Sequence, residues 1–162
     1  MRTENFFWGS IVLGMHDALV STLGLIAGLV FANAGRYVII LTGIIACVAA
    51  ALSMAASEYL AQKANGNIGD ALPRGLATGA TYISTAVLLL LPFVFIGNTF
   101  IAMGMMYVVA VSVIWFFNFL KYRLSNVPFW PRFLEMLGIC FIVTASAFII
   151  GECARICFGI QI

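Results

Sequence analysis

Two acids interrupt stretches of the chain that are otherwise apolar and long enough to cross a membrane. Asp17 lies in the middle of residues 6–31, and Glu58 lies near the end of the next stretch, residues 37–62. A carboxylate near the centre of a bilayer costs about 2.5 kcal/mol or more, so an acid at such a depth usually serves the passage of an ion or a proton. Asp17 and Glu58 are therefore the first candidates for a functional site.

A methionine shares a helix face with the second acid. Met54 precedes Glu58 by four residues, which stacks the two side chains one above the other on a helix. Carboxylates alone suit calcium, magnesium or manganese, whereas a thioether beside them favours ferrous iron or another late transition metal. Methionine also fills irregular gaps in apolar cores. Both interpretations of Met54, as ligand and as packing residue, stay open, and each acid is also able to alternate between metal and proton.

The composition indicates the class of protein. The chain has 162 residues, of which 64% are hydrophobic and only 9% charged, and its mean hydropathy is +1.11. Soluble domains carry about 25% charged residues, so we expect a multi-pass integral membrane protein. The net charge of +2 gives no basis for nucleic-acid binding. The cysteines lack zinc or disulfide spacing, and we expect all of them to be small buried side chains: Cys47, Cys140, Cys153 and Cys157.

Five apolar stretches predict an all-α fold with five transmembrane helices in a single domain, residues 1–162. Each is long enough to cross about 30 Å of hydrocarbon. The predicted spans are residues 6–31, 37–62, 75–96, 99–120 and 132–158. We expect a polar linker of about a dozen residues, 63–74, between the second and third spans. A bend is expected at Pro92.

The basic residues predict the orientation in the membrane. Six fall on one side of the predicted spans: Arg2, Lys63, Arg74, Lys121, Arg123 and Arg132. Only Arg36 and Arg155 fall on the other side. The positive-inside rule then places the N-terminus in the cytosol and the C-terminus outside, and we expect a bacterial or archaeal cell membrane rather than an organelle membrane. At 1.5 Å per helical residue, a cation from the cytosol would meet Glu58, then Met54, then Asp17.

Small residues form a stripe on the first span, at steps of three and four: Gly14, Asp17, Ser21, Gly24 and Gly28. The last two make a G-x-x-x-G motif, which lets helix backbones approach closely in lipid. We expect two copies of the first span to meet along this stripe in a two-fold homodimer, with two Asp17 side chains across an axial pathway. Ordinary packing is the alternative for the glycines. Ser57 flanks a matching row of small residues on the second span.

Other polar residues are weaker candidates. His16 lies about 100° around the helix from Asp17, and we keep it as a candidate for lining the pathway, together with Ser21, Gly24, Gly28 and Ser57. Glu135 follows Arg132 by three residues, and Arg155 follows Glu152 by three. Both spacings predict ion pairs near helix ends.

Two segments resemble signatures of the vacuolar iron transporter family. Residues 16–28, HDALVSTLGLIAG, resemble its first-helix N-D-G-L-V-S-T signature with the Gly-bearing run that follows, and residues 51–60, ALSMAASEYL, resemble its second-helix A-L-S-M-A-x-G-E-Y signature. The resemblance implies a five-helix dimer that moves ferrous iron, often manganese, out of the cytosol in exchange for protons. It also places Asp17, Met54 and Glu58 on the transport path. The metal is then cargo, no cofactor is expected, and the partners are the lipid bilayer and a second copy of the chain.

The chain departs from the family pattern in two ways. His16 replaces an Asn, and Ala18 and Ser57 replace Gly, which narrows the space beside the path. The 63–74 segment carries a single acid, Asp70, where plant and fungal members have a cytosolic helical domain rich in Glu and Met. We therefore expect weak capture of the metal.

Alternative functions remain open. A proton-coupled exporter of organic cations also uses one membrane acid in its first helix, but it would need aromatic residues along the face of that acid. A scaffold that transports nothing leaves Asp17 unexplained. An enzyme is not expected, because the chain has one histidine and no nucleophile–base or metalloprotease motif.

Overall fold

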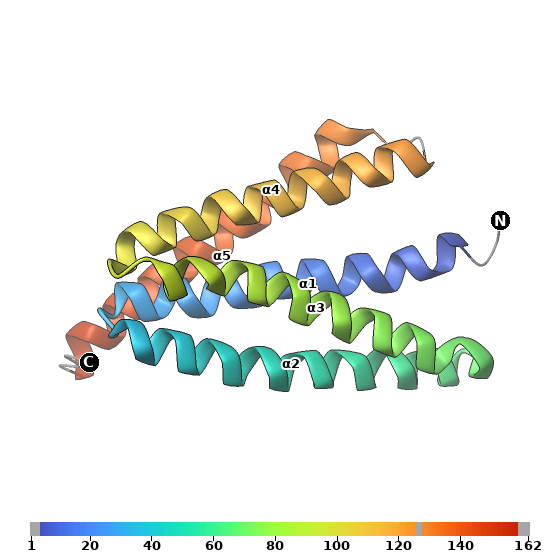
Figure 1. The fold of residues 1–162 in the computed structure, drawn as a ribbon, viewed down its shortest axis with the longest axis horizontal. Helices are drawn as coiled ribbons and strands as arrows, with labels where there is room; N and C mark the ends of the chain where they lie inside the picture. Colours follow the sequence, from blue (N-terminus) through green and yellow to red (C-terminus); the bar gives the residue numbers. More distant parts are fainter. Residues whose placement is uncertain (1–3, 126–127, 159–162) are drawn as a thin grey trace.

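The computed structural model describes residues 4–125 and 128–158, and nearly all of these residues are helical. The elements are α1 (Glu4–Phe31), α2 (Arg36–Ala64), α3 (Ile68–Phe95), α4 (Thr99–Ser125) and α5 (Phe129–Phe158). Figure 1 shows these helices lying along one common direction. Each of the five is long and apolar enough to cross a membrane. The predicted all-α, multi-pass class is therefore confirmed.

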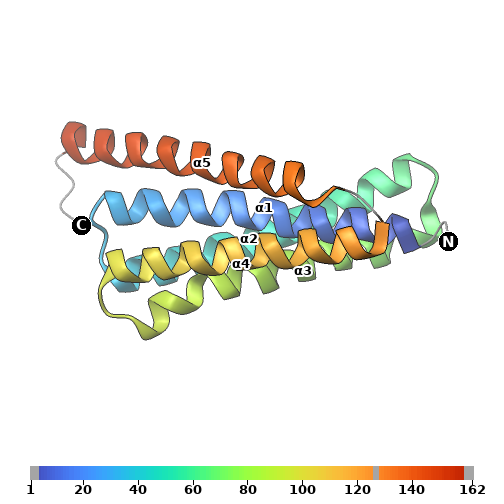
Figure 2. The same cartoon turned by 90° about the horizontal axis from the view of Figure 1, so that it is seen from above.

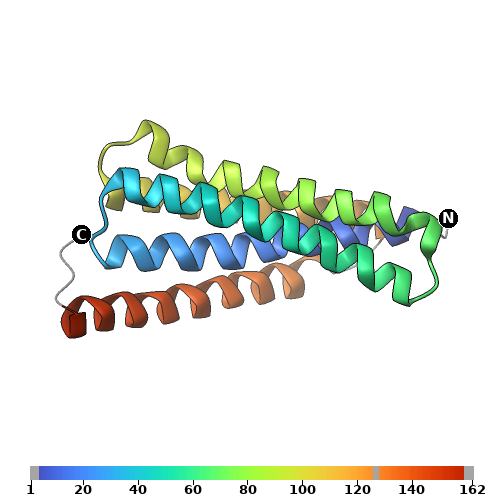
Figure 3. The ribbon, with the colours of Figure 1, turned by 90° about the horizontal axis from the view of Figure 1, so that it is seen from below.

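The first helix is the centre of the bundle. α1 packs against each of the other four helices, whereas α2 packs chiefly against α3 and α1, and α5 packs against α1 and α4. Figures 2 and 3 show α5 along one side of α1 and apart from α2. The N-terminal end of α1, the α2–α3 turn and the C-terminal end of α4 share one end of the bundle, as Figure 1 shows. Side chains on α1 can therefore meet groups from all the other helices.

The buried face of α1 forms the core of the bundle. Met15, Leu19 and Leu23 are at most 1% exposed and pack with Tyr82, Phe93 and other buried side chains of α3 and α4. The outer faces of α2, α4 and α5 instead present large apolar side chains, as expected for surfaces that face lipid. The prediction for the cysteines is only half right. Cys47 and Cys140 are buried, but Cys153 and Cys157 are exposed near the end of α5.

Glycines bring α1, α2 and α3 into backbone contact. A Cβ atom at Gly14 of α1 would lie 2.2 Å from the carbonyl oxygen of Thr78 on α3. A Cβ at Gly75 of α3 would lie 2.6 Å from the carbonyl oxygen of Ala55 on α2, and one at Gly79 would lie 2.9 Å from the Ala55 Cβ. Gly75 and Gly79 form a second G-x-x-x-G motif, which our sequence analysis missed.

The predicted linker at residues 63–74 is wrong. α2 continues to Ala64 and α3 begins at Ile68, so a three-residue turn joins them. Gly66 has a φ of +80°, which favours glycine, and its N–H donates to the Lys63 carbonyl. The N–H of Asn67 donates to the Gln62 carbonyl, which completes a Schellman cap. Pro73 misled the prediction because it lies inside α3 near its start, where it removes a single backbone hydrogen bond.

Two further boundaries differ from the prediction. α4 extends to Ser125 and α5 begins at Phe129, so the predicted loop between the fourth and fifth spans is much shorter. Pro92 lies near the C-terminal end of α3, and Figure 2 shows the last part of this helix turning away from its earlier course. The longer helices place Arg74 within α3, where it is only 3% exposed.

Candidate metal pathway

Neutral hydrogen-bond donors hold the carboxylate of Glu58. Ser10 Oγ of α1 donates to Glu58 Oε1 at 2.7 Å, and Gln62 Nε2 donates to the same oxygen at 3.0 Å. Asn67 Nδ2, in the α2–α3 turn, donates in turn to Gln62 Oε1 at 3.2 Å. Among the described residues no donor reaches Oε2 of Glu58, so that oxygen is available to a cation.

The expected alternative, an ion pair between Glu58 and Lys63, is not formed in the described structure. The Lys63 ammonium lies 5.4 Å from the centre of the Tyr59 ring instead. Glu58 is partly buried and points toward α1. Its negative charge is thus oriented by neutral groups and is not cancelled by Lys63.

A pair of hydroxyl groups lies next to Asp17. Ser21 Oγ donates to the backbone oxygen of Asp17 at 2.6 Å and lies 2.6 Å from Tyr82 Oη of α3. Because the single hydroxyl hydrogen of Ser21 goes to Asp17, Tyr82 is the donor in the second contact. Tyr82 is only 2% exposed, and its hydroxyl lies within the electrostatic range of the Asp17 charge. Tyr82 was not predicted, because no spacing in the sequence connects α3 with this part of α1.

Two contacts define the register of the antiparallel helices α1 and α2. One is the Ser10–Glu58 hydrogen bond, and the other joins Thr22 Oγ1 and Cys47 Sγ at 3.7 Å. Asp17 follows Ser10 by seven residues, or about 10 Å along the helix axis. Met54 lies one turn from Glu58, about 6 Å along the same direction. The axial order is therefore Glu58, Met54, Asp17.

The same register separates the two acids within one chain. About 10 Å of axial distance is too long for Asp17 and Glu58 to bind one ion together. Among the described residues, no group of three His, Cys, Asp or Glu side chains is arranged to hold a metal. The two carboxylates are thus separate positions within one chain.

A model of the VIT family matches residues 8–72. The matched segment contains α1, α2 and the beginning of α3, and with them both signature segments and the Ser10–Glu58 contact. The match covers 65 of the 162 residues, so the chain resembles the VIT family over its first two helices and the start of the third. This similarity favours transport of metal ions across membranes. No curated protein matches the chain.

The side chain of Met54 packs partly buried against the apolar core. This position, one turn from Glu58, is compatible with packing and with a weak sulfur ligand. Ser57, the neighbouring candidate on α2, is exposed.

The glycines of the α1 stripe have a different partner from the one we predicted. A Cβ atom at Gly24 would lie 2.9 Å from Val143 Cγ1 of α5, and one at Gly28 would lie 3.8 Å from the Ala147 carbonyl oxygen. A Cβ at Gly151 of α5 would approach the Gly28 carbonyl oxygen to 2.8 Å. α5 of the same chain therefore covers this part of the stripe, where we had expected a second copy.

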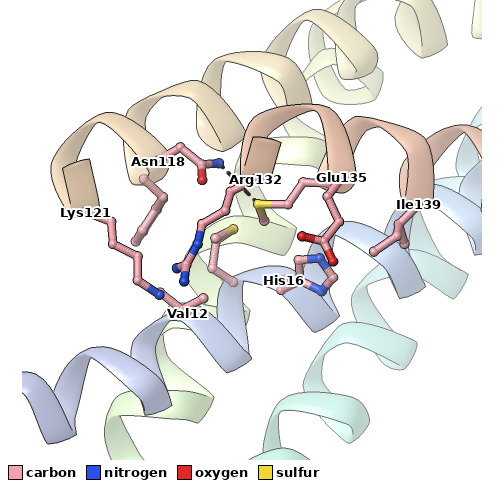
Figure 4. A pocket seen from close by; sticks show the side chains of 10 residues that line it. Val12, His16, Asn118, Lys121, Arg132, Glu135 and Ile139 are labelled. Atoms are coloured by element: carbon pink, nitrogen blue, oxygen red, sulfur yellow. Dashed lines mark hydrogen bonds between the residues drawn. The ribbon is translucent and has the colours of Figure 1, made fainter. Parts of the chain in front are cut away.

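His16 faces a separate pocket between α1, α4 and α5, which Figure 4 shows from close by. This pocket lies away from the helix face of Asp17, because successive residues of a helix point about 100° apart. Of the two predicted ion pairs, Arg155 and Glu152 form theirs. Arg132 and Glu135 do not, and both line the His16 pocket.

The charged residues differ between the two ends of the bundle. Five basic residues lie at or near the end that holds the start of α1: Lys63, Arg74, Lys121, Arg123 and Arg132. Arg2 lies outside the described residues. At the opposite end, Arg36 Nε donates to the Phe93 carbonyl at 2.7 Å and its Nη2 donates to the Val94 carbonyl, which caps α3. Arg155 pairs with Glu152 there, so both basic residues of this end have a structural role.

Proposed function

We propose that a homodimer of this protein moves a divalent transition metal, ferrous iron or manganese, out of the cytosol in exchange for protons, as its similarity to the VIT family suggests. The observation that carries the proposal is the placement of two membrane carboxylates, Glu58 and Asp17, at successive depths along α1 and α2. The surplus of basic residues at the Glu58 end supports a cytosolic position for that end.

Glu58 serves as the capture point. Its Oε1 atom is oriented by Ser10 and Gln62, and Oε2 is left for the incoming ion. Because all three members of the Ser10, Gln62 and Asn67 network are neutral, the carboxylate keeps its full attraction for a cation. The three-residue α2–α3 turn supplies no acidic side chain of its own, so we expect capture to need a higher free metal concentration than in relatives with a metal-binding domain.

Asp17 serves as the central station, completed by a second copy of the chain. In a single chain Asp17 is only partly buried and Ser21 beside it is exposed. Figure 3 shows α1 between α2 and α5 in the view from below. An acid left facing hydrocarbon costs about 2.5 kcal/mol or more. A two-fold contact would remove that cost and place two carboxylates and two Ser21 hydroxyls around one axis.

Proton exchange follows from the cost of an uncompensated charge in the membrane. An empty, charged Asp17 site is expensive in a membrane, so a carboxylate that releases its ion to the outside is expected to return protonated. Each transport cycle would then bring protons into the cytosol as the metal leaves.

Proteoliposomes with an acidic lumen and the cytosolic face of the protein outward test this function. Ferrous iron or manganese is added outside, and lumenal metal and lumenal pH are followed together. Metal uptake with a rise in lumenal pH is the expected result. Metal uptake that does not depend on the proton gradient would indicate a channel. Proton-coupled flux of an organic cation without metal flux would indicate the alternative exporter of organic cations.

A further inference from the structure

A polar cavity lies on the opposite flank of α1 from the proposed pathway. It has a volume of about 300 Å³ and lies between α1, α4 and α5. Its charged and polar lining residues are His16, Asn118, Lys121, Arg132 and Glu135, and the remainder of its wall is apolar. Nothing in the proposed transport path uses this cavity.

Two cationic side chains share one wall of the cavity. Figure 4 shows the side chains of Lys121 and Arg132 extending from α4 and α5 toward the same space. Within residues 4–125 and 128–158, neither forms an ion pair, and their charges act on each other. Like charges that face one cavity repel each other, so this wall favours an anion.

The other polar groups limit what the anion can be. The amide of Asn118 is already engaged, since Nδ2 donates to the Ile114 carbonyl at 2.8 Å and to Met136 Sδ at 3.2 Å. Glu135 lies beside His16 on the far side of the cavity, as Figure 4 shows. With Lys121, Arg132 and Glu135 ionised, the cavity carries a single net positive charge, which suits an anion of low charge and leaves the Glu135 carboxylate as an acceptor.

Aromatic residues place the cavity at the level of lipid headgroups. Tyr122 and Trp130 are 48% and 68% exposed and lie on α4 and α5 within two residues of Lys121 and Arg132, and Trp115, which is 50% exposed, lies further along α4. Exposed Trp and Tyr side chains of membrane proteins gather at the interface between hydrocarbon and water. Basic pockets between transmembrane helices at this depth bind lipid headgroups.

We propose that this cavity binds a phosphate group, with Arg132 and Lys121 as its ligands. Arg132 supplies paired N–H donors for two phosphate oxygens, and Lys121 supplies a point charge. A lipid phosphodiester, whose headgroup hydroxyl or ammonium would donate to Glu135, and free phosphate are the two sources of this chemistry. A metal ion is disfavoured despite His16 and Glu135, because two cationic side chains face the same space. The site is independent of the transport path.

Thermal unfolding of the purified full-length protein in detergent tests the site. The melting temperature is recorded against increasing short-chain phosphatidylglycerol, inorganic phosphate, or diacylglycerol with the same chains. We expect phosphatidylglycerol to raise the melting temperature and diacylglycerol to leave it unchanged. A rise with inorganic phosphate alone would identify free phosphate as the source. Equal rises with phosphatidylglycerol and diacylglycerol, or no rise with either phosphate compound, would overturn the proposal.

Matched variants identify the ligands. Arg132→Gln and Lys121→Gln should each weaken the apparent affinity about tenfold, because each removes a charge-assisted hydrogen bond. Arg123→Gln is the control, since its guanidinium lies over the Phe119 ring at 5.8 Å and does not line the cavity. Lys121→Arg keeps the charge and should retain binding, which separates loss of a ligand from loss of the fold. Unchanged affinity in both glutamine variants would also overturn the proposal.

Discussion

Glu58 and Asp17 are both membrane acids, yet their surroundings differ in kind. Glu58 is oriented by a chain of three neutral side chains from α1, α2 and the α2–α3 turn. Asp17 has hydrogen-bonded polar neighbours on its α3 side, where Ser21 Oγ contacts Tyr82 Oη. The Asp17 side chain itself is partly exposed. In the proposed pathway Glu58 therefore acts within one chain, whereas Asp17 needs a second copy of the chain to complete its site.

The packing of α1 also differs from one neighbouring helix to another. On the α3 side of α1, Gly14 meets the backbone of Thr78, a contact that leaves no room for a methyl group. On the α5 side, Gly24 meets the end of the Val143 side chain, which is able to move. At Gly14 α1 is thus fixed to the α3 backbone, whereas at Gly24 it is held by a softer contact, and α5 meets the α1 backbone only further along, where Gly151 approaches the Gly28 carbonyl.

The largest expected effect is that of Asp17→Asn. This change keeps the size of the side chain but removes the charge that binds metal and carries the proton, so metal uptake should fall about 100-fold. Uptake into proteoliposomes is the measurement, with Ser112→Ala as control, because Ser112 is exposed and bonds only to its own helix. Undiminished uptake in Asp17→Asn would remove Asp17 from the path.

A smaller effect is expected at the capture point. Glu58→Gln should lower uptake about tenfold at low metal, because a neutral amide attracts the ion less, and high metal should partly restore it. Ser10→Ala removes only one of the two donors to Oε1 and should cost less than Glu58→Gln. A decrease in the maximal rate without any change in the metal concentration for half-maximal uptake would contradict a capture role.

Measuring the free energy of unfolding tests whether the α3 contact at Gly14 is tighter than the α5 contact at Gly24. Gly14→Ala should lower the free energy of unfolding by about 1–3 kcal/mol, because the new methyl group would overlap a backbone oxygen. Gly24→Ala should cost less, since the Val143 side chain has room to adjust. Gly138→Ala serves as control, with no atom within 4 Å of its added Cβ. Equal destabilisation by all three substitutions, measured by thermal unfolding in detergent, would contradict the contrast.

The smallest effect is expected at Met54. Met54→Leu keeps the volume of the side chain and removes a soft ligand, so iron uptake should fall a few-fold more than manganese uptake. The ratio of the two initial rates is the quantity to compare with the parent protein. An equal loss for both metals would indicate that Met54 only packs.

Much of the fold could be predicted from hydropathy, and the errors have physical causes. Five apolar stretches predict five helices, but the cluster of Asn, Gly, Asp and Pro at residues 63–74 resembles a long loop. Its polar residues instead occupy the ends of two helices that extend beyond the membrane-length core. The Gly75–Gly79 motif was visible in the sequence and would have predicted the tight α2–α3 contact.

The candidate site was predictable only in part. Asp17 and Glu58 stand out because acids are costly in lipid. Both acids also lie within the signature-like segments, residues 16–28 and 51–60. The roles of Ser10 and Tyr82 depend on which helices lie side by side, which periodicity in one helix does not reveal. The partner of Gly24 and Gly28 was wrongly predicted for the same reason, because α5 is more than a hundred residues away in the sequence.

Mixed dimers test the central claim, that Asp17 acts across two chains and Glu58 within one. Wild-type protein is combined at varied fractions with Asp17→Asn or with Glu58→Gln, the dimers are allowed to form at random and are reconstituted, and metal uptake is measured. If two Asp17 carboxylates share one site, uptake should fall with the square of the wild-type fraction for Asp17→Asn and in proportion to that fraction for Glu58→Gln. A proportional fall for both variants would contradict the shared site and indicate that each chain transports metal on its own.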